Sequence, residues 1–436
     1  MNLKFLKTKE FKVKFVISIA LLILFSMSFL FKNQLEHAFG LKQKYSINEI
    51  SMSKSNESNY KVHYLDVGQG NCSIVELPDG KVMIIDGGSD MYGGKISDFL
   101  NSKNIRTIDY MIATHADADH IGGLNYLFEN FEIINVFRPM QIAGTTVEET
   151  SSNGEVTSHF EVYENEDLKD VYMLYVSSKF VEVTSYRYRE FIKNIYSETY
   201  YDDGTICKTN VTVFYDGLKI AGDNYEFEFY APLKTEDEID LSNLSNTNGY
   251  MTKIYGNDSS NNSSSIFLLE ICGDKFFFSG DASAVREEID NLTKFAENDF
   301  IESLTDDEVA KLAAVDVYLV AHHGSKYSSS FSLLNLIKPD FAVVSVGKND
   351  YGHPSEEVLG RLDEINSLEV DGILLTSEQG NITFCSVSEN VVFLLEKSSK
   401  QNELTIQLEY LLLIIFVVVE ICVVYARPRI KKNKTD

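Results

Sequence analysis

Apolar residues fall into two kinds of run along this chain. Two long uninterrupted runs lie near the ends, at residues 15–31 and 410–426, and many short runs fill the region between them. Long apolar runs are typical of membrane-spanning helices, whereas short runs rich in Val, Ile, Phe and Tyr, bounded by Gly, Pro or Asp, are typical of strands. The pattern therefore predicts a strand-rich domain between two terminal helices.

The strands are expected first as a block and then in alternation with helices. Residues 60–67, 72–77 and 81–86 form the opening block, and the Pro-Asp-Gly at 78–80 predicts a hairpin turn. After residue 265 comes a buried hairpin around "CGD", and strands and helices alternate from there. A strand block followed by strand–helix alternation indicates sheets that are covered by helices on their outer faces.

Residues 141–208 differ from both parts. They are acidic and rich in Tyr, Ser and Thr, show no clear apolar face over most of their length, and predict an insertion with one helix near 187–197. The predicted segments are a tail and first span at 1–32, a linker at 33–59, a hydrolase-type domain at 60–396, a linker at 397–407 and a second span with a basic tail at 408–436.

Each terminal run has 17 residues, so a helix would be roughly 25 Å long, near the lower limit for crossing a bilayer. A buried core helix is the alternative for both runs, and a cleaved signal peptide is a further one for the first. Basic residues are concentrated on the terminal side of each run, which favours two membrane spans with both tails cytoplasmic. The middle, about residues 33–407, would then be extracytoplasmic at the cell membrane, with the lipid bilayer as a partner. Glu420 lies within the second run, either as a protonated or snorkelling residue or as a functional one.

Composition sets further bounds. With 436 residues and 44% hydrophobic content the chain can form a sizeable core, and its net charge of −26 does not attract polyanions. None of the five cysteines forms a C-x-x-C pair, which disfavours a thiolate zinc site. Cys72, Cys272 and Cys385 lie in apolar strand-like contexts and are expected to be buried free thiols.

Potential metal ligands are densest in "ATHADADHIGG", residues 113–123, which begins at the end of the strand expected at 108–114. His115, Asp117 and Asp119 alternate, so they point the same way on an extended segment, and His120 can join them at a bend. Four nitrogen and oxygen ligands converging at a strand end suit Zn²⁺, Mn²⁺ or Fe²⁺. The alternative is an ordinary polar surface turn.

Four other candidates also follow predicted strand ends, and we therefore expect them to gather at the same edge as the cluster. They are Asp281 in "FFFSGDAS", His322 and His323 in "VAHHGSKYSSS", and His353 in "NDYGHPSEE". His63 is expected to be a core residue. His159 lies in the insertion and is expected to be exposed, although it could add an imidazole to the cage.

Taken in order, six motifs resemble the metallo-β-lactamase fold, and within it the outward-facing hydrolase domain of the competence protein ComEC and its stand-alone relatives. The motifs are "LDVGQGN", "IIDGG", "THADADHIGG", "FFSGDAS", "AHHGSKYSSS" and "SVGKNDYGHP". The resemblance covers about residues 60–390 without the insertion, and lacks ComEC's multi-span channel region. It implies an α/β fold, a four-layer αββα sandwich, here flanked by two transmembrane helices.

The resemblance also implies a dinuclear site with two divalent cations, Zn or Mn. His115 and Asp117 would hold one cation, Asp119, His120 and His353 the other, and Asp281 would bridge them. Most of the superfamily has His at position 117, and Asp there favours Mn²⁺ more. A separate third His of the first site has no evident counterpart.

Residues around the ligands receive supporting roles from the same resemblance. Asp86 would orient a ligand, and Asp66 and Gln69, with the neighbouring glycines, would shape the floor of the site. His322 or His323, together with Asp119, would be catalytic. Ser325 and the serines at 328–330 precede a helix, where they could cradle a phosphate or simply cap the helix.

The function expected is an extracytoplasmic metal-dependent hydrolase, foremost a phosphodiesterase or nuclease that uses a metal-bound hydroxide, with nucleic acid as one candidate substrate. A teichoic-acid-type phosphodiesterase of the cell envelope, a non-catalytic binding or signalling ectodomain and a β-lactamase-like amide hydrolase are the alternatives. The intact ligand set argues against a non-catalytic role, and the HHGS motif argues against an amide hydrolase. Oligomeric state is not predicted.

Overall fold

The computed structural model describes residues 59–139, 141–151, 156–162, 181–231, 259–284, 295–365, 367–369, 372–387 and 390–395. These residues belong to one compact unit, residues 50–397. Both predicted membrane spans lie outside the described residues. Within those residues, no helix combines the length and apolar character needed to cross a bilayer.

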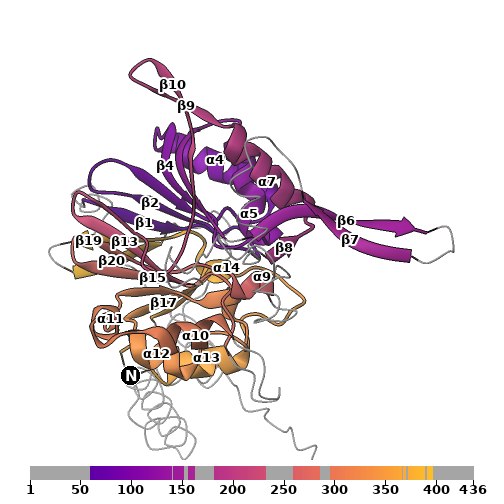
Figure 1. Cartoon of the computed structure of the whole chain (residues 1–436). Helices are drawn as coiled ribbons and strands as arrows, with labels where there is room; N and C mark the ends of the chain where they lie inside the picture. The colour runs from indigo at the N-terminus through magenta and orange to yellow at the C-terminus, as the bar shows by residue number, and fades with distance from the viewer. Residues whose placement is uncertain are drawn as a thin grey trace, which may run out of the picture. The chain divides into compact units, whose positions relative to one another are not determined.

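Two large sheets form the centre of the unit (Figure 1). The first has eight strands in the order β11 (Asn210–Val213), β5 (Glu132–Arg138), β4 (Thr107–Ile112), β3 (Val82–Ile85), β2 (Ser73–Glu76), β1 (Lys61–Tyr64), β19 (Ile382–Val387) and β20 (Asn390–Leu395). The predicted hairpin turn joins β2 to β3, where the Gly80 N–H donates to the Leu77 carbonyl at 3.0 Å. Strands β3, β4 and β5 run parallel, so their carboxyl ends share one edge.

The second sheet begins with antiparallel strands and continues with parallel ones. Its order is β12 (Lys219–Gly222), β13 (Tyr225–Ala231), β14 (Ile266–Ile271), β15 (Asp274–Phe278), β16 (Val317–Leu319), β17 (Phe341–Val344) and β18 (Ile373–Leu375). The predicted hairpin around "CGD" is confirmed as β14–β15. Because β15, β16 and β17 are parallel, the loops after them emerge side by side.

Aromatic side chains fill the space between the sheets. Phe267 and Phe278 of the second sheet stack with ring centroids 4.9 Å apart, and Phe278 stacks in turn on Tyr64 of the first sheet at 6.2 Å. All three side chains are buried within one hydrophobic cluster. Burial of such rings dominates the energetics of a core, so this layer holds the two sheets together.

Helices cover the outer face of each sheet (Figure 1). The first sheet carries α4 (Gly93–Ser102), α5 (Ala118–Leu127) and α7 (Tyr186–Ser197), and the second carries α10 (Ala296–Ser303), α11 (Asp306–Leu312), α12 (Phe331–Ile337) and α13 (Glu356–Asp363). Short elements are η2 (Asp90–Tyr92), α9 (Ser259–Asn262), η6 (Ala321–Gly324) and α14 (Thr376–Gln379). The predicted α/β architecture, two sheets between helical layers, is confirmed.

The region predicted as an insertion has two characters. Its predicted helix is confirmed as α7, but Tyr188 and Phe191 of α7 are fully buried against the first sheet's helical layer. That part is therefore core and not an appendage. The remainder forms a small sheet of β6 (Gln141–Thr150), β7 (Val156–Val162) and β8 (Val181–Val183) and a hairpin of β9 (Thr199–Asp202) and β10 (Thr205–Lys208).

Two of three cysteine predictions are confirmed. Cys72 and Cys385 are buried free thiols, whereas Cys272 is exposed. Cys272 occupies the β14–β15 turn with φ of 55°, so its side chain points out of the sheet and the prediction of burial was wrong. His63 is a core residue as predicted, 2% exposed, with ring nitrogens 2.8 Å from Thr383 Oγ1 and from Glu76 Oε1.

Candidate metal centre

The first half of the site comes from the loop between β4 and α5. His115 lies three residues beyond the end of β4, Asp117 is the N-cap residue of α5, and Asp119 and His120 lie in its first turn. His115 and His120 are fully buried, whereas the Asp117 side chain is 44% exposed. A strand end and a helix start thus present two imidazoles and two carboxylates from six successive residues.

The second half comes from the other sheet. Asp281 follows β15, and His322 and His323 form η6 directly after β16. Both histidines have left-handed backbones, with φ of 50° and 53°. Side chains other than Gly adopt this conformation at an energetic cost, and such residues gather at functional sites.

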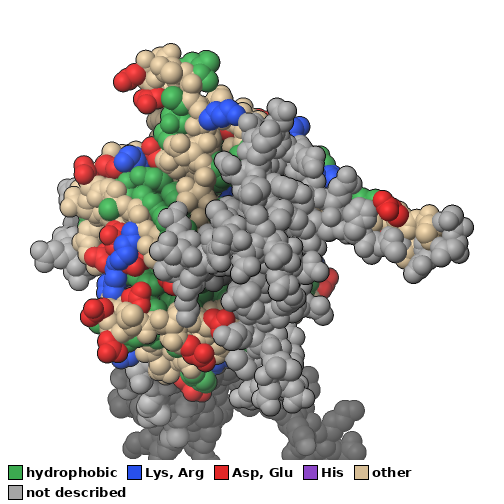
Figure 2. Space-filling model, viewed as in Figure 1, with side chains coloured by type: hydrophobic (Ala, Val, Ile, Leu, Met, Phe, Trp, Pro, Cys, Tyr) green, Lys and Arg blue, Asp and Glu red, His purple; other side chains and the backbone are tan. Residues whose placement is uncertain are grey.

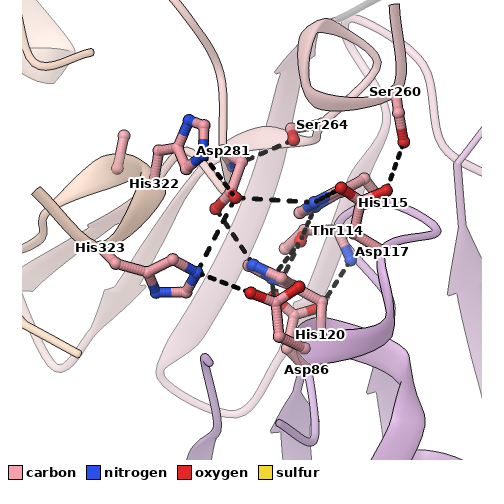
Figure 3. A network of polar contacts seen from close by, with 12 residues as sticks. Asp86, Thr114, His115, Asp117, His120, Ser260, Ser264, Asp281, His322 and His323 are labelled. Atoms are coloured by element: carbon pink, nitrogen blue, oxygen red, sulfur yellow. Dashed lines mark hydrogen bonds and ion pairs between the residues drawn. The ribbon is translucent and has the colours of Figure 1, made fainter. Parts of the chain in front are cut away.

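Asp281 lies at the centre of the arrangement (Figure 3). Its Oδ1 is 3.1 Å from Nε2 of His120, and its Oδ2 is 3.8 Å from Nε2 of His115. On the other side, Oδ2 is 3.6 Å from Nε2 of His322 and 3.8 Å from Nε2 of His323. One buried carboxylate therefore faces four imidazoles, which is the position expected for a ligand shared between two cations.

The ligand atoms at the centre carry no hydrogen bond. Nε2 of His115, His120 and His323 and Oδ1 of Asp281 are all buried and unsatisfied by any hydrogen-bonding partner. Buried polar atoms are normally paired, so a set of four such atoms aimed at one another fits divalent cations. Within the described residues, two groups have ligand atoms within 4.8 Å of one another: His115, His120 and Asp281, and Asp119, His120 and His323.

Asp86 fixes the orientation of His120. Nδ1 of His120 donates to Oδ2 of Asp86 at 2.7 Å, which leaves Nε2 as the lone-pair nitrogen facing Asp281. Asp86 also accepts from the Thr114 N–H and hydroxyl, both at 2.8 Å, and so ties the end of β3 to the end of β4. A histidine ligand held by a carboxylate in this way is the usual outer support of a metal site. Asp86 therefore lies where the sequence predicted an orienting residue.

His323 is oriented by the loop that follows β17. Its Nδ1 donates to the Ser345 carbonyl at 2.9 Å, so its Nε2 faces Oδ2 of Asp119 at 3.2 Å. Ser345 Oγ in turn donates to the Gly70 carbonyl at 2.7 Å. The predicted floor loop at 66–70 thus supports a ligand through Ser345. This loop is the part of "LDVGQGN" that reaches the site.

Charges within the cluster reinforce one another. Burial opposes protonation of His120, but the carboxylates of Asp281 and Asp86 outweigh it and raise the pKa of His120 well above its ordinary value. For Asp281, burial is likewise outweighed, and the surrounding imidazoles hold its pKa well below the ordinary range. A site in which carboxylates stay ionised against buried imidazoles is one in which a cation can replace bound protons.

His323 lies closer to the predicted ligands than His353 does. The ligand atoms of His323, Asp119 and His120 lie within 4.8 Å of one another and could hold a metal ion. His353 lies outside that group, half-buried, with its ring 5.3 Å from the ring of His322. Burial and the nearby imidazoles lower the pKa of His353 to about 4, so its ring is neutral at pH 7.

The serine run serves the fold. Ser328 Oγ donates to the Ala321 and Ser325 carbonyls, and Ser330 Oγ accepts from the Leu333 N–H as the N-cap of α12. The backbone N–H groups of Ser329 and Ser330 both donate to the buried carboxylate of Glu297 at 2.8 Å. The capping alternative is therefore the one observed, and an internal carboxylate takes the donors suggested for a phosphate.

The ligand side chains grouped around Asp281 form what we call the cage. The remaining predicted residues lie around it at different distances. Ser325 is buried two residues after His323 in the chain, and its N–H donates to the His322 carbonyl at 2.9 Å. Asp66 accepts from the Gly68 N–H at 3.2 Å and forms an exposed ion pair with Lys95, so it shapes the floor loop and does not enter the cage. Gln69 faces the Gly347 N–H at 3.5 Å. The side chain of His159 lies outside the described residues.

Sequence reasoning missed three supporting hydroxyls. Ser260 Oγ donates to Oδ1 of Asp117 at 2.6 Å, Ser264 Oγ accepts from the Asp281 N–H at 3.0 Å, and Ser345 carries the floor contact described above. Ser260 and Ser264 stand in a serine- and asparagine-rich stretch that reads as a loop. Ser345 could have been recognised from the sequence as a supporting residue, because it is a polar residue at the end of an apolar strand. The same holds for Thr114, whose hydroxyl donates to Asp86.

Comparisons with known proteins agree with this geometry. Residues 65–140 match the family described as Metallo-beta-lactamase superfamily. Recombination protein 2 of Haemophilus influenzae is 23% identical over 71% of this chain and 27% of its own length. ComE operon protein 3 of Bacillus subtilis is 23% identical over 74% of this chain and 33% of its own length. The chain thus spans between a quarter and a third of these curated relatives.

Solved structures also match. The metallo-beta-lactamase fold protein YhfI from Bacillus subtilis has a TM-score of 0.37 and 8% identity, over 74% of this chain and 98% of that protein. The resemblance predicted from the motifs, to the metallo-β-lactamase fold and to ComEC-type competence proteins, is confirmed at the level of the family match and the curated relatives.

Proposed function

We propose that this chain, whose residues 65–140 carry the metallo-beta-lactamase superfamily signature, is a metal-dependent phosphodiesterase. The superfamily match supports a hydrolase fold. The proposal that phosphodiesters are the substrates rests on the side chains of the site. The observation that carries the proposal is the convergence of four imidazoles on the buried carboxylate of Asp281.

The ligand residues would divide into two groups around Asp281. His115 and Asp117, whose ligand atoms are 3.8 Å apart, would hold one divalent cation, Zn or Mn, and Asp119, His120 and His323 the other. Cations bound there would lower the pKa of a bound water and polarise the phosphoryl oxygens. Asp86 and the Ser345 carbonyl keep His120 and His323 in the tautomers that such binding requires.

His322 is the candidate general acid. Its Nε2 is 3.6 Å from Oδ2 of Asp281, yet its side chain is 24% exposed, so the ring borders both the cage and solvent. When the bond between phosphorus and the leaving oxygen breaks, that oxygen needs a proton, and Nε2 of His322 could supply it. His353 packs its neutral ring against His322 and would limit the orientations of that acid.

Surface charge bears on the substrate. Figure 2 shows Asp and Glu side chains spread over the described part of this face, with Lys and Arg in small groups between them. The net charge of the chain is −26. Tracking along a polyanion needs rows of basic contacts that release counterions. We therefore favour a short phosphodiester, or the end of a longer one, over extended duplex DNA.

Membrane anchoring belongs to the same proposal. The apolar runs at 15–31 and 410–426 with basic flanks support two spans, both termini cytoplasmic and an extracytoplasmic catalytic domain. An enzyme so placed would act on phosphodiesters outside the cell membrane, whether nucleic acid or a cell-envelope polymer.

Hydrolysis of bis-p-nitrophenyl phosphate by the full chain with Mn²⁺ or Zn²⁺ tests the proposal. His115→Ala and Asp281→Ala should each lower kcat/KM by at least about 100-fold, because each removes a ligand of the cage. Asp202→Ala is the matched control, since this exposed carboxylate lies on β9 outside the site. Cleavage of p-nitrophenyl phosphorylcholine in preference would favour the envelope substrate.

Three results would count against the proposal. Failure to cleave any phosphodiester with any divalent cation would leave the non-catalytic ectodomain as the better account. Cleavage of a β-lactam without cleavage of phosphodiesters would indicate an amide hydrolase. Equal activity of wild type and Asp281→Ala would show that the cage is not the active site.

A further inference from the structure

An exposed tyrosine stands beside the site on the loop after β17. The side chain of Tyr351 is 78% exposed, the most exposed of the large apolar side chains in the described residues. The loop runs from Ser345, which orients His323, to His353, which contacts His322. Single exposed rings are common on protein surfaces, and this one is distinguished by its place beside the site, where its face is available to a bound substrate.

Asn349 holds the backbone of this loop in one conformation. Its Nδ2 donates to the Gly347 carbonyl at 2.9 Å and to the His353 carbonyl at 2.8 Å. Its Oδ1 accepts from the Tyr351 N–H at 3.0 Å and from the His353 N–H at 3.1 Å. One side chain thus makes four hydrogen bonds that fix the loop on both sides of Tyr351, so the tyrosine is presented on a braced support.

The ring of Tyr351 is linked to the cage through two imidazoles. Its centroid lies 5.9 Å from that of His353 at an interplanar angle of 33°, and His353 contacts His322 at 5.3 Å. Nε2 of His322 is 3.6 Å from Asp281. The series places one aromatic ring next to the imidazoles that border the cage, on the His353 side.

The charges of the loop do not favour binding a phosphate there. Lys348 and Asp350 are both exposed and flank Asn349, so the loop carries one charge of each sign. The aromatic face is therefore its main binding feature. Nucleobases stack on such faces irrespective of sequence, and each stack contributes about 1–3 kcal/mol.

We propose that Tyr351 is a stacking platform for the nucleobase next to the scissile phosphate, and that Asn349 is the residue that positions it. The inference rests on the proposed phosphodiesterase function and names the part of the substrate that the site selects. It assigns specificity to a residue outside the ligand set, and it places the base on the His353 side of the cage.

Kinetic measurements on the full chain with two ester substrates test this inference. Thymidine 5′-(p-nitrophenyl phosphate) carries a base, methyl p-nitrophenyl phosphate does not, and both release p-nitrophenolate. Tyr351→Ala should raise KM for the thymidine ester by roughly 5- to 100-fold, the equivalent of one stacked base, with little change in kcat. KM for the methyl ester should stay as in wild type, and Tyr351→Phe should retain thymidine ester binding.

Asn349→Ala tests whether Asn349 positions Tyr351, as distinct from the contact that Tyr351 itself makes with the base. We expect a smaller rise in KM for the thymidine ester than with Tyr351→Ala, because the tyrosine is present but less constrained, whereas an effect transmitted through His353 should change kcat equally for both esters. Tyr201→Ala is the matched control, since that tyrosine is 66% exposed on β9 away from the cage. It should leave both esters unchanged.

A binding measurement distinguishes failure of this inference from failure of the proposed function. In calorimetric titrations, thymidine 5′-monophosphate should bind Tyr351→Ala at least 5-fold more weakly than wild type, whereas inorganic phosphate should bind both equally. Equal binding of thymidine 5′-monophosphate to both proteins would overturn the platform even if both esters are hydrolysed. An equal rise in KM for both esters would show that Tyr351 contacts the nitrophenyl group, which would also overturn it. Weakened binding in a protein that hydrolyses neither ester would support the platform and refute the hydrolase.

Discussion

Nε2 of His120 lies 3.1 Å from Oδ1 of Asp281, although the two residues belong to opposite sheets. His120 lies in the first turn of α5, after β4 of the eight-stranded sheet, and Asp281 follows β15 of the seven-stranded sheet. The cage therefore exists only when the two sheets are stacked. Ligands that bind the folded state alone stabilise it, so cation binding and the sandwich should be thermodynamically coupled.

Replacing Asp86 by Asn should weaken the site without removing a ligand. An amide has one acceptor oxygen where the carboxylate has two, so Asn cannot accept from the His120 Nδ1–H and the Thr114 N–H together, and His120 is held less firmly. Loss of such support typically costs 10- to 100-fold in metal affinity or activity. Titration of divalent cations into Asp86→Asn and into the exposed control Asp98→Asn would measure the difference. Identical affinity in both variants would contradict the assigned role.

Gly347 provides a test of the floor of the site. A Cβ at this position would lie 2.5 Å from the Gly68 carbonyl carbon and 2.6 Å from the Gln69 nitrogen, so Gly347→Ala must push the two loops apart. We expect a loss of about 1–3 kcal/mol in the free energy of unfolding, and at least about a 10-fold loss of kcat/KM because His323 shifts with Ser345.

Gly360→Ala is the matched control for that change. Gly360 lies within α13, and a Cβ there meets no atom within 4 Å. The substitution should raise the free energy of unfolding by about 0.5–1 kcal/mol through helix propensity and leave activity unchanged. Thermal unfolding and ester hydrolysis measured on both variants check the pair. Similar behaviour of the two variants would argue against close packing between the loops.

Much of the site was predictable because parallel strands end at a common edge. His115, Asp281 and His322 each follow an apolar strand directly, and that signal is visible in the sequence. The position of His323, closer to the predicted ligands than His353, was not visible. It depends on the left-handed backbone of His323 and on its hydrogen bond to the Ser345 carbonyl, which arise from the three-dimensional loop geometry.

The fold shows the same division between local and non-local signals. Hairpins such as β14–β15 follow from two short continuous apolar runs on either side of a Gly turn. The apolar face of α7 is visible in the sequence, because the buried residues from Tyr188 to Ile195 recur at helical spacing. What this face covers is a non-local property, since it packs against the helical layer of the first sheet.

Phe191→Ala tests whether α7 is part of the core. The Phe191 side chain is fully buried and contacts Phe128 and Tyr188 with ring centroids 6.1 and 6.2 Å away. Truncation should lower the free energy of unfolding by about 3–5 kcal/mol. In chemical denaturation, the exposed control Tyr201→Ala should stay within about 0.5 kcal/mol of wild type. If Phe191→Ala changes the free energy of unfolding only slightly, α7 is an appended insertion and not part of the core.

Glu76 should contribute to the acid sensitivity of the domain. Burial alone would raise its pKa, but hydrogen bonds from His63 and Lys103 outweigh this and lower the pKa to about 2 from an ordinary value of 4.5. A depressed carboxyl pKa stabilises the fold above the unfolded value, and that stabilisation is lost as pH falls from about 4.5 towards 2.

Glu76→Gln should therefore reduce the loss of free energy of unfolding that the wild type shows as pH falls from about 4.5 towards 2. At pH 7 the variant should be less stable by about 1–3 kcal/mol, the range for hydrogen bonds to charged groups. The two proteins should converge only as pH falls to about 2. The exposed control Glu129→Gln should follow the wild-type curve. Parallel curves for wild type and Glu76→Gln from pH 7 to pH 2 would contradict the assignment.

The most direct test of the whole account is calorimetric titration of the full chain with Mn²⁺ or Zn²⁺. If residues from both sheets chelate the same cations, His120→Ala from the first sheet and Asp281→Ala from the second should each weaken binding at least about 10-fold, while Asp202→Ala binds as wild type does. Wild-type affinity in Asp281→Ala, or no saturable binding by the wild-type chain, would contradict the shared metal centre.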